Sequence, residues 1–294
     1  MPDELFLALL EFRGRGNQDG VIIVRNLPLP SESLGATPPR WDATKPLGAQ
    51  YQTEMLLIGF TALLGEVFSF QTQQAGKLVQ DIVPTKTEEY GQTSSGSEVF
   101  LDWHIEDAFS DLRADYVGLL CIRSDGKAAT TFASVRRMQI PAEVKAILSQ
   151  PRFNFEPDGA HPELQHLALA RAPVLYGDQN DPFLRFDALF TRPDEGDLDA
   201  ANALDSLRQF IPAVAREFPL AAGDLLLIDN RRVVHGRTPY APRYDGSDRW
   251  LQRVSLMVDP ARASTALQVA PRVFLPCSTG THERVAAFVD DHVY

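Results

Sequence analysis

Two of the six histidines lie in segments whose residue types and spacing suit a metal centre. His104 and Glu106 are two residues apart, so on a β-strand both side chains would point to the same face. His235 follows an apolar segment, 226–228, that is typical of a buried strand. Two imidazoles and one carboxylate form the ligand set that suits non-haem Fe(II) and leaves coordination positions open. A catalytic zinc site with the same ligand types is the alternative, although its usual His-Glu-x-x-His motif does not occur in this sequence.

Two arginines follow His235 at the next predicted strand, 250–258. Arg249 immediately precedes that strand and Arg253 lies within it. A guanidinium binds a carboxylate through two parallel hydrogen bonds. An arginine in this position is what a dicarboxylate co-substrate would need if its other end chelated the metal. The arginines therefore strengthen the prediction of an iron site.

The elements that must position these residues are mostly short strands. The patterns predict strands at 20–25, 78–83, 99–103, 116–123, 130–135, 224–228, 233–234, 250–258 and 265–274. They predict helices at 3–12, 50–64, 141–150 and 198–218, the last interrupted at Pro212. Many short strands separated by turn residues, with few helices, indicate an all-β core.

No repeat and no boundary divides the chain, so we expect residues 1–294 to form a single domain. Residues 151–180 are polar, contain prolines and lack periodicity, which is typical of a lid or binding loop. We interpret His161 and His166 in this segment as exposed lid residues rather than metal ligands.

The composition is that of a globular protein, with 44% hydrophobic and 23% charged residues. The net charge of −11 disfavours a nucleic-acid or anionic membrane partner. The longest uncharged apolar run, within 54–66, is shorter than the roughly 20 residues that span a bilayer. Two cysteines, Cys121 and Cys277, cannot form a disulfide framework. These features predict a cytoplasmic location and a small-molecule partner, with no obligate protein partner inferred.

Two longer motifs carry a resemblance to a known family. Residues 103–109 with 113–116, and residues 229–237 with 244–246 and 249–250, resemble the clavaminate synthase-like branch of Fe(II)/2-oxoglutarate-dependent oxygenases. The likeness runs from about residue 73 to residue 258. It implies a mainly β (α+β) fold, with a double-stranded β-helix (jelly-roll) core and flanking helices. It also implies Fe(II), 2-oxoglutarate and O2 as cofactor and co-substrates.

The resemblance also assigns site residues. It implies His104, Glu106 and His235 as iron ligands, and Arg249 with Thr131 as the binding residues for the distal carboxylate of 2-oxoglutarate. The substrate residues that it implies are Gln74 for the α-amino group, Arg253 with Ser94 or Ser95 for the α-carboxylate, and Asp187 for the side chain.

The branch includes hydroxylases of free L-arginine, L-asparagine and L-lysine, so the resemblance implies hydroxylation at C3, or at C4, with release of succinate and CO2. Glu106 favours hydroxylation over halogenation, because halogenating relatives have a small residue there. Arginine-hydroxylating relatives carry a second acidic residue two positions after the one at Asp187, where this chain has Leu189. A lysine-like, cyclic or neutral substrate therefore stays open.

Two alternatives also stay open at this point. One is an oxygenase of the same family that acts on a carrier-tethered, cyclic or non-amino-acid substrate by hydroxylation, desaturation or cyclisation. The other is a jelly-roll binding protein without catalytic activity.

Overall fold

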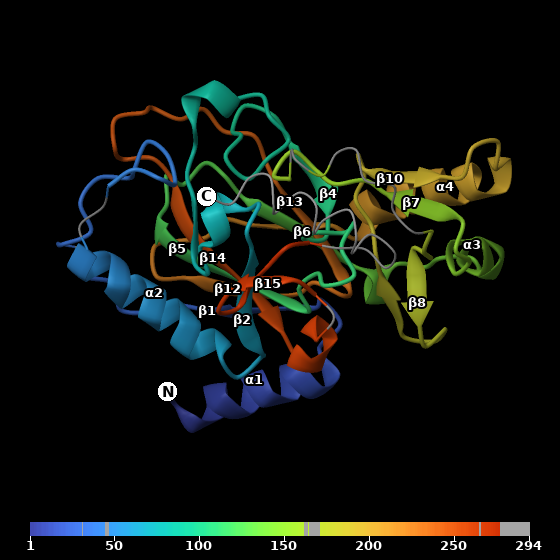
Figure 1. Cartoon of the computed structure of the whole chain (residues 1–294), viewed down its shortest axis with the longest axis horizontal. Coiled ribbons are helices and arrows are strands. Elements are labelled where there is room, and N and C mark those ends of the chain that lie inside the picture. The colour runs from blue at the N-terminus through green and yellow to red at the C-terminus, as the bar shows by residue number, and fades with distance from the viewer. Residues whose placement is uncertain (31, 45–46, 162–163, 165–170, 265, 277–294) are drawn as a thin grey trace.

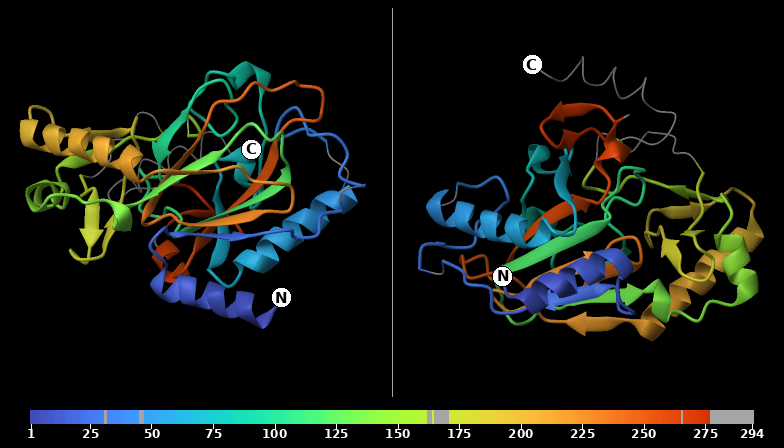
Figure 2. Two further views of the ribbon diagram at one scale, coloured as in Figure 1. Left: turned by 180° about the vertical axis from the view of Figure 1, so that it is seen from behind. Right: turned by 90° about the horizontal axis from the view of Figure 1, so that it is seen from below.

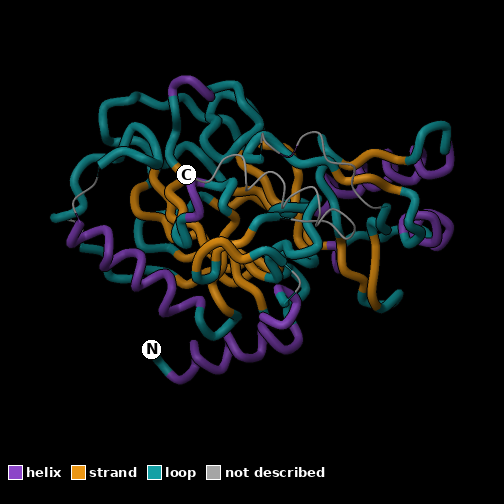
Figure 3. Tube along the Cα trace, in the orientation of Figure 1, coloured by secondary structure: helices purple, strands orange, loops and turns teal. Residues whose placement is uncertain are grey.

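The fold is a sheet-rich α+β arrangement, with strands at the centre and helices at the periphery (Figures 1 and 3). It was obtained as a computed structural model, which describes residues 1–30, 32–44, 47–161, 164, 171–264 and 266–276. His166, Cys277, His282 and His292 lie outside the described residues.

The larger sheet has the strand order β1-β12-β5-β14-β2-β16-β15, and β3 also pairs with β14. Its strands are β1 (Val21–Val24), β2 (Glu66–Phe70), β3 (Gln80–Ile82), β5 (Tyr116–Arg123), β12 (Leu225–Asp229), β14 (Trp250–Met257), β15 (Gln268–Ala270) and β16 (Val273–Phe274). The pairs β1–β12, β12–β5 and β5–β14 are antiparallel, and β16 pairs with β2 in parallel.

The smaller sheet has the order β11-β6-β13-β4 and carries two of the candidate metal ligands. Its strands are β4 (Leu101–His104), β6 (Thr130–Ser134), β11 (Arg216–Phe218) and β13 (Val233–Arg237). Two short antiparallel pairs complete the described strands: β7 (Phe153–Phe155) with β10 (Thr191–Pro193), and β8 (Leu175–Gly177) with β9 (Pro182–Leu184).

Alternation of side chains along the strands divides the core into layers. In β12, Leu226 and Ile228 join a hydrophobic cluster that also contains Phe132 of β6 and Val233 of β13, so this cluster lies between the two sheets. Leu225 and Leu227 point to the opposite face and join the cluster under the N-terminal helices. Because His235 is two residues after Val233 on β13, its side chain points to the space between the sheets.

Within the described residues, four α-helices cover the outer faces (Figure 2). The helices α1 (Asp3–Arg15) and α2 (Leu47–Thr61) pack on the larger sheet through Leu9, Phe12 and Leu57. The helices α3 (Ala142–Leu148) and α4 (Leu198–Val214) pack on the smaller sheet, where Leu204 and Leu207 join Val234 of β13. Short 3₁₀ turns lie at Gln74–Gly76, Lys86–Glu88, Val135–Arg137 and Pro260–Ala263.

Two expectations about elements need correction. The helix α4 continues through Pro212 to Val214, whereas we expected an interruption there. A proline two residues before the end of a helix removes one hydrogen bond near a terminus that frays in any case. The segment 151–180 contains the strands β7 and β8, and Phe153 and Phe155 of β7 are buried, so part of it is core rather than loop.

Among the described helices, none has the length and apolar character needed to cross a membrane.

Candidate metal centre

His104, Glu106 and His235 converge although 131 positions separate the first and the last along the chain. Each offers one ligand atom, and these three atoms lie within 4.8 Å of one another. His104 on β4 is the direct cross-strand partner of His235 on β13, and their ring centroids are 4.5 Å apart. The smaller sheet therefore brings together the two imidazoles that the sequence places on separate strands.

The hydrogen bonds of His104 select the nitrogen that is available to a metal. Its Nδ1 lies 2.7 Å from the main-chain oxygen of Asp102, which can accept a hydrogen bond but cannot donate one. Nδ1 must therefore carry the hydrogen and donate it, which leaves the lone pair on Nε2. This arrangement is the usual way in which proteins orient a histidine ligand.

Glu106 is held as a carboxylate by its neighbours. Burial raises its pKa, but Arg253 and His235 lower it by more, so the pKa lies well below its usual range. Nη1 of Arg253 donates to both carboxylate oxygens, at 2.7 and 2.6 Å, and Nε2 of His235 lies 3.2 Å from Oε1. Burial and the adjacent His104 lower the pKa of His235. A charged carboxylate and a neutral imidazole are the forms that bind a metal ion.

Glu106 itself does not lie on a strand, which corrects our expectation. The strand β4 ends at His104, and Glu106 occupies the turn that follows. The two-residue spacing therefore does not by itself place both side chains on one face. The main chain of Glu106 is held instead by Asn230, which comes from the turn between β12 and β13.

The metal-ligand triad borders a cavity that also contains Arg249. Arg249 is buried, with 6% of its surface exposed, and it has no hydrogen-bond or ion-pair partner among the described residues. A buried guanidinium without a counter-ion is costly, so this side chain fits an anionic ligand. Arg253 also lines the cavity, where its Nε and Nη2 donate to Oε1 of Gln80.

The structure places Gln73, rather than Gln74, at the cavity wall. The side-chain amide of Gln74 bonds both main-chain groups of Asp81, at 2.8 and 3.0 Å. Gln73 is buried and donates to Asp107, and its Oε1 accepts from Gln80. The turn at this point explains the exchange, because Gln74 and Ala75 both have a positive φ angle and reverse the chain.

A similar offset of one residue occurs on β6. Thr130 lines the cavity, whereas Thr131 is not among the lining residues. Thr131 pairs with Gly236, and its hydroxyl is buried without a hydrogen-bond partner in the described part of the chain. Because side chains alternate along a strand, neighbouring threonines face opposite sides of the sheet. Thr130 is therefore on the cavity side of β6, and Thr131 is on the other side.

Ser94 lines the cavity, and its neighbour Ser95 is buried beside it in the chain. The main-chain oxygen of Ser95 accepts a hydrogen bond from Thr85. Arg237 donates to the main-chain oxygens of Ser97 and Val99, so the end of β13 holds the loop that carries the two serines.

Two carboxylates of the cavity come from outside the sheets. The main chain of Asp187 pairs with that of His104 in an isolated antiparallel β-bridge. The Oδ1 of Asp187 accepts from the main-chain nitrogens of Leu189 and Phe190. Asp158 of the segment 151–180 also lines the cavity, and its Oδ1 accepts from the main-chain nitrogen of Ala160. Burial raises the pKa of both carboxyl groups. Sequence reasoning anticipated Asp187 but not Asp158, because a single aspartate in an aperiodic segment gives no pattern.

His161 contradicts our interpretation of an exposed lid residue. Its side chain is fully buried, and its Nε2 lies 2.9 Å from Oδ1 of Asp107. Nδ1 lies 2.6 Å from the hydroxyl of Thr72, and the ring packs against Phe109 at a centroid distance of 4.7 Å. His161 therefore ties the segment 151–180 to the turn that carries Glu106.

Comparison with known proteins identifies the family. The sequence matches the family described as "Taurine catabolism dioxygenase TauD, TfdA family" over residues 8–255, which include the three candidate ligands and Arg249. The chain belongs to this family.

Relatives with assigned activities resemble this TauD/TfdA-family chain over most of their length. It is 33% identical to "Enduracididine beta-hydroxylase" of Streptomyces hygroscopicus over 290 residues, covering 90% of this chain and 84% of the relative. It is 38% identical to "L-asparagine oxygenase" of Streptomyces coelicolor over 273 residues, covering 92% and 80%.

Solved structures give the same result. The non-heme iron oxygenase OrfP, in complex with Fe, succinate and (3S)-hydroxy-L-Arg, superposes with a TM-score of 0.86 at 35% identity. That match covers 93% of this chain and 86% of the other. OrfP has also been solved with Fe and alpha-ketoglutaric acid. An asparagine oxygenase in complex with Fe(II), 2S,3S-3-hydroxyasparagine and succinate superposes with a TM-score of 0.83 at 36% identity, covering 94% and 86%.

The residues of this dioxygenase fit iron and 2-oxoglutarate. Two imidazoles and a carboxylate supply the donor set of a non-haem Fe(II) site, and no cysteine lines the cavity in the described part of the chain. The buried guanidinium of Arg249 lacks a partner in the same part of the chain, as a binding group for an anion would.

Proposed function

We propose that this dioxygenase hydroxylates a free L-amino acid at an unactivated carbon, C3 or C4, and converts 2-oxoglutarate to succinate and CO2. The observation that carries the proposal is the convergence of His104, Glu106 and His235 in one cavity with Arg249 and Arg253. Relatives that hydroxylate arginine, asparagine or lysine support it. We also propose that the two main sheets form the jelly-roll core that the sequence motifs imply.

His104, Glu106 and His235 would hold Fe(II), and Arg249 would hold the distal carboxylate of 2-oxoglutarate. When bound, these groups and O2 supply the oxidising power that replaces a C–H bond by C–OH. The protein side chains decide which carbon reacts, because they fix the substrate relative to the metal centre.

The cavity offers separate groups for the two ends of an α-amino acid. Arg253 and Ser94 line the cavity and would bind the α-carboxylate. Oε1 of Gln73 accepts one hydrogen bond from Gln80 and retains a second lone pair for an α-ammonium group. We therefore assign the role expected for Gln74 to Gln73.

The substrate side chain that fits this cavity is cationic. Asp158 and Asp187 both line it, and each uses only Oδ1 in the hydrogen bonds to its own loop. Burial raises the pKa of both carboxyl groups, because it disfavours their charged forms. A cationic group of the substrate bound near them would offset this cost. Leu189 beside Asp187 provides an apolar wall for an aliphatic stem. We propose a basic L-amino acid with an ammonium or guanidinium group.

A substrate panel tests the proposal. Purified protein with Fe(II), 2-oxoglutarate and O2 is incubated with common and non-proteinogenic L-amino acids, and products are scored for a mass gain of one oxygen. We expect turnover of basic amino acids, no product from the His104→Ala or Glu106→Ala variants, and loss of selectivity in Asp187→Asn and Asp158→Asn. Turnover confined to neutral amino acids would contradict the cationic assignment.

The same assay separates the alternatives. A carrier-tethered substrate predicts that no free amino acid stimulates succinate formation above the uncoupled rate. A binding protein predicts neither succinate nor the visible charge-transfer band of anaerobic Fe(II) with 2-oxoglutarate.

A further inference from the structure

Asn230 makes a set of hydrogen bonds that only a side-chain amide can satisfy. It is fully buried in the turn between β12 and β13. Its Oδ1 accepts from the main-chain nitrogen of Glu106 at 2.8 Å, and its Nδ2 donates to the main-chain oxygens of Glu106 at 3.2 Å and of Ala114 at 2.9 Å. One donor and two acceptors face it, so a carboxylate or an apolar side chain leaves buried groups unpaired.

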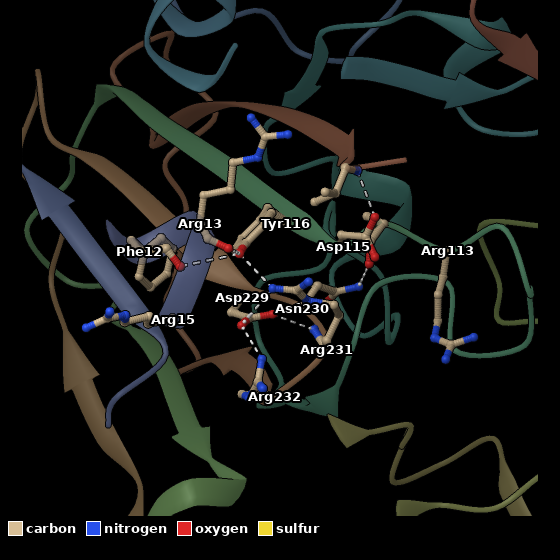
Figure 4. A network of polar contacts seen from close by, with 12 residues as sticks. Phe12, Arg13, Arg15, Arg113, Asp115, Tyr116, Asp229, Asn230, Arg231 and Arg232 are labelled. Atoms are coloured by element: carbon tan, nitrogen blue, oxygen red, sulfur yellow. Dashed lines mark hydrogen bonds and ion pairs between the residues drawn. The ribbon is translucent and has the colours of Figure 1, made fainter. Parts of the chain in front are cut away.

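The turn that carries Asn230 is fixed from its outer side as well (Figure 4). The carboxylate of Asp229 accepts from Arg231 at 2.8 Å and from Arg232 at 3.1 Å. Arg231 also donates to the hydroxyl of Tyr116 at 2.6 Å, and that hydroxyl donates to the main-chain oxygen of Arg13 at the end of α1. This outer network anchors the turn to β5 and α1 without touching Glu106.

The same turn leads directly into β13, which carries His235. Glu106 has left its strand, so no sheet hydrogen bond fixes its main chain relative to β13. Asn230 is the connection that does so, across 124 positions of sequence. The register of β13 with β4 already sets His235 against His104. Asn230 thereby completes the placement of the third ligand relative to the other two.

We propose that Asn230 is a positioning residue for the metal site, which holds the Glu106 carboxylate at the distance from His104 and His235 that metal binding requires. The inference rests on the proposed iron site. Loss of groups that orient metal ligands typically lowers metal affinity by about 10- to 100-fold. The effect of changing Asn230 should therefore appear in metal binding before any turnover takes place.

The experiment titrates the apoprotein with Co(II), followed by its d–d absorption, and compares wild type with Asn230→Asp. This substitution keeps the shape and the acceptor for Glu106 but turns an acceptor toward two main-chain oxygens. We expect Co(II) affinity about 10- to 100-fold weaker in the folded variant, as judged by near-UV circular dichroism. Activity should recover in part as the Fe(II) concentration is raised. Asn230→Ser provides the same measurement if the aspartate variant does not fold.

Two control variants separate positioning from general destabilisation. Tyr116→Phe weakens the outer network of the same turn, and Asn154→Asp makes the same chemical change on β7, where Asn154 faces Asp194. Both should lose thermal stability and keep wild-type Co(II) affinity. Wild-type affinity in folded Asn230→Asp, or equal losses in the controls, would overturn the inference. If wild type and His104→Ala bind Co(II) equally, the proposed metal site fails, and this inference fails with it.

Discussion

Arg249 and Arg253, two of the three arginines that line the cavity, carry the same charge but have different partners. Arg253 is paired with Glu106 and Gln80, whereas Arg249 has no hydrogen-bond or ion-pair partner within the described residues. Arg253 thus holds a metal ligand in its charged form, in addition to the substrate contact that we propose for it, whereas Arg249 has its whole guanidinium available for an anion. At the scale of single residues, surroundings rather than residue type separate the two roles.

Arg249→Gln should raise the KM for 2-oxoglutarate by about 10- to 100-fold, because charge-assisted hydrogen bonds contribute roughly 1.5–3 kcal/mol. The KM is obtained from the rate of succinate formation, uncoupled or substrate-dependent, measured as a function of 2-oxoglutarate concentration. Arg40→Gln is the matched control, since Arg40 is exposed and its side chain pairs with Asp42 alone among the residues that the structure describes. An unchanged KM in the Arg249 variant would show that the co-substrate binds elsewhere.

Cys121 should resist alkylation in the folded protein. Burial on β5 raises its pKa to about 12, so almost no thiolate forms at pH 8. Iodoacetamide labelling followed by peptide mass spectrometry should find Cys121 modified only after denaturation. Rapid labelling of Cys121 in the native protein would mean that the sheet opens at β5.

At the scale of elements, the pairing of β13 with β4 sets the distance between the two histidines. The register of this pair shifts between His235 and Arg237, whose partners are His104 and Leu101 of β4. Gly236 lies at the shift, and a Cβ atom there would come within 2.3 Å of the main-chain oxygen of Leu101. The close approach of the two strands therefore depends on the missing side chain.

Gly236→Ala should separate β13 from β4 and disturb the two imidazoles together. We expect a loss of about 1–3 kcal/mol in the free energy of unfolding, typical of an overpacked core, and a large loss of activity. Gly59→Ala on α2 is the control, because nothing lies within 4 Å of its Cβ position and alanine favours helix. Denaturant unfolding and turnover assays measure both, and normal activity in Gly236→Ala would contradict the argument.

At the scale of the whole molecule, the site joins parts of the chain that fold into different layers. His104 belongs to the smaller sheet, and Glu106 lies in the turn after its strand β4. Arg253 belongs to the larger sheet, and Asp158 comes from the segment beyond α3. A ligand that contacts all of them should stabilise the folded state as a unit, because it binds only when both sheets are in place.

Metal with co-substrate should therefore raise the melting temperature. At 100 times the dissociation constant, binding contributes about 2.7 kcal/mol, which corresponds to roughly 4 °C for a chain of 294 residues that unfolds as one unit. Thermal unfolding of the metal-free protein with and without Mn(II) and 2-oxoglutarate measures the shift. His235→Ala should lose it, and a shift of equal size in that variant would place the metal outside the triad.

The sequence alone was sufficient where a pattern is local. His104, Glu106 and His235 were predicted as ligands, and the structure brings their ligand atoms within 4.8 Å. The strand 116–123 was predicted with the bounds that β5 has, because apolar residues fill both of its faces. The strand follows from the period of its apolar residues, whereas the ligand set follows from residue types and family motifs, because Glu106 lies outside β4.

Only the tertiary structure decided which neighbour of a pair faces the cavity. Gln73 and Thr130 line the cavity where Gln74 and Thr131 were expected. The chain turns at Gln74 with a positive φ angle, and the side chains of β6 alternate between the two faces of the sheet, so in each pair the preceding residue faces the cavity. Burial of His161, the entry of Asp158 into the cavity and the hold of Asn230 on Glu106 also lie beyond sequence reasoning. Each depends on contacts between residues far apart in the chain, and neither residue of such a contact carries a local signal of its partner.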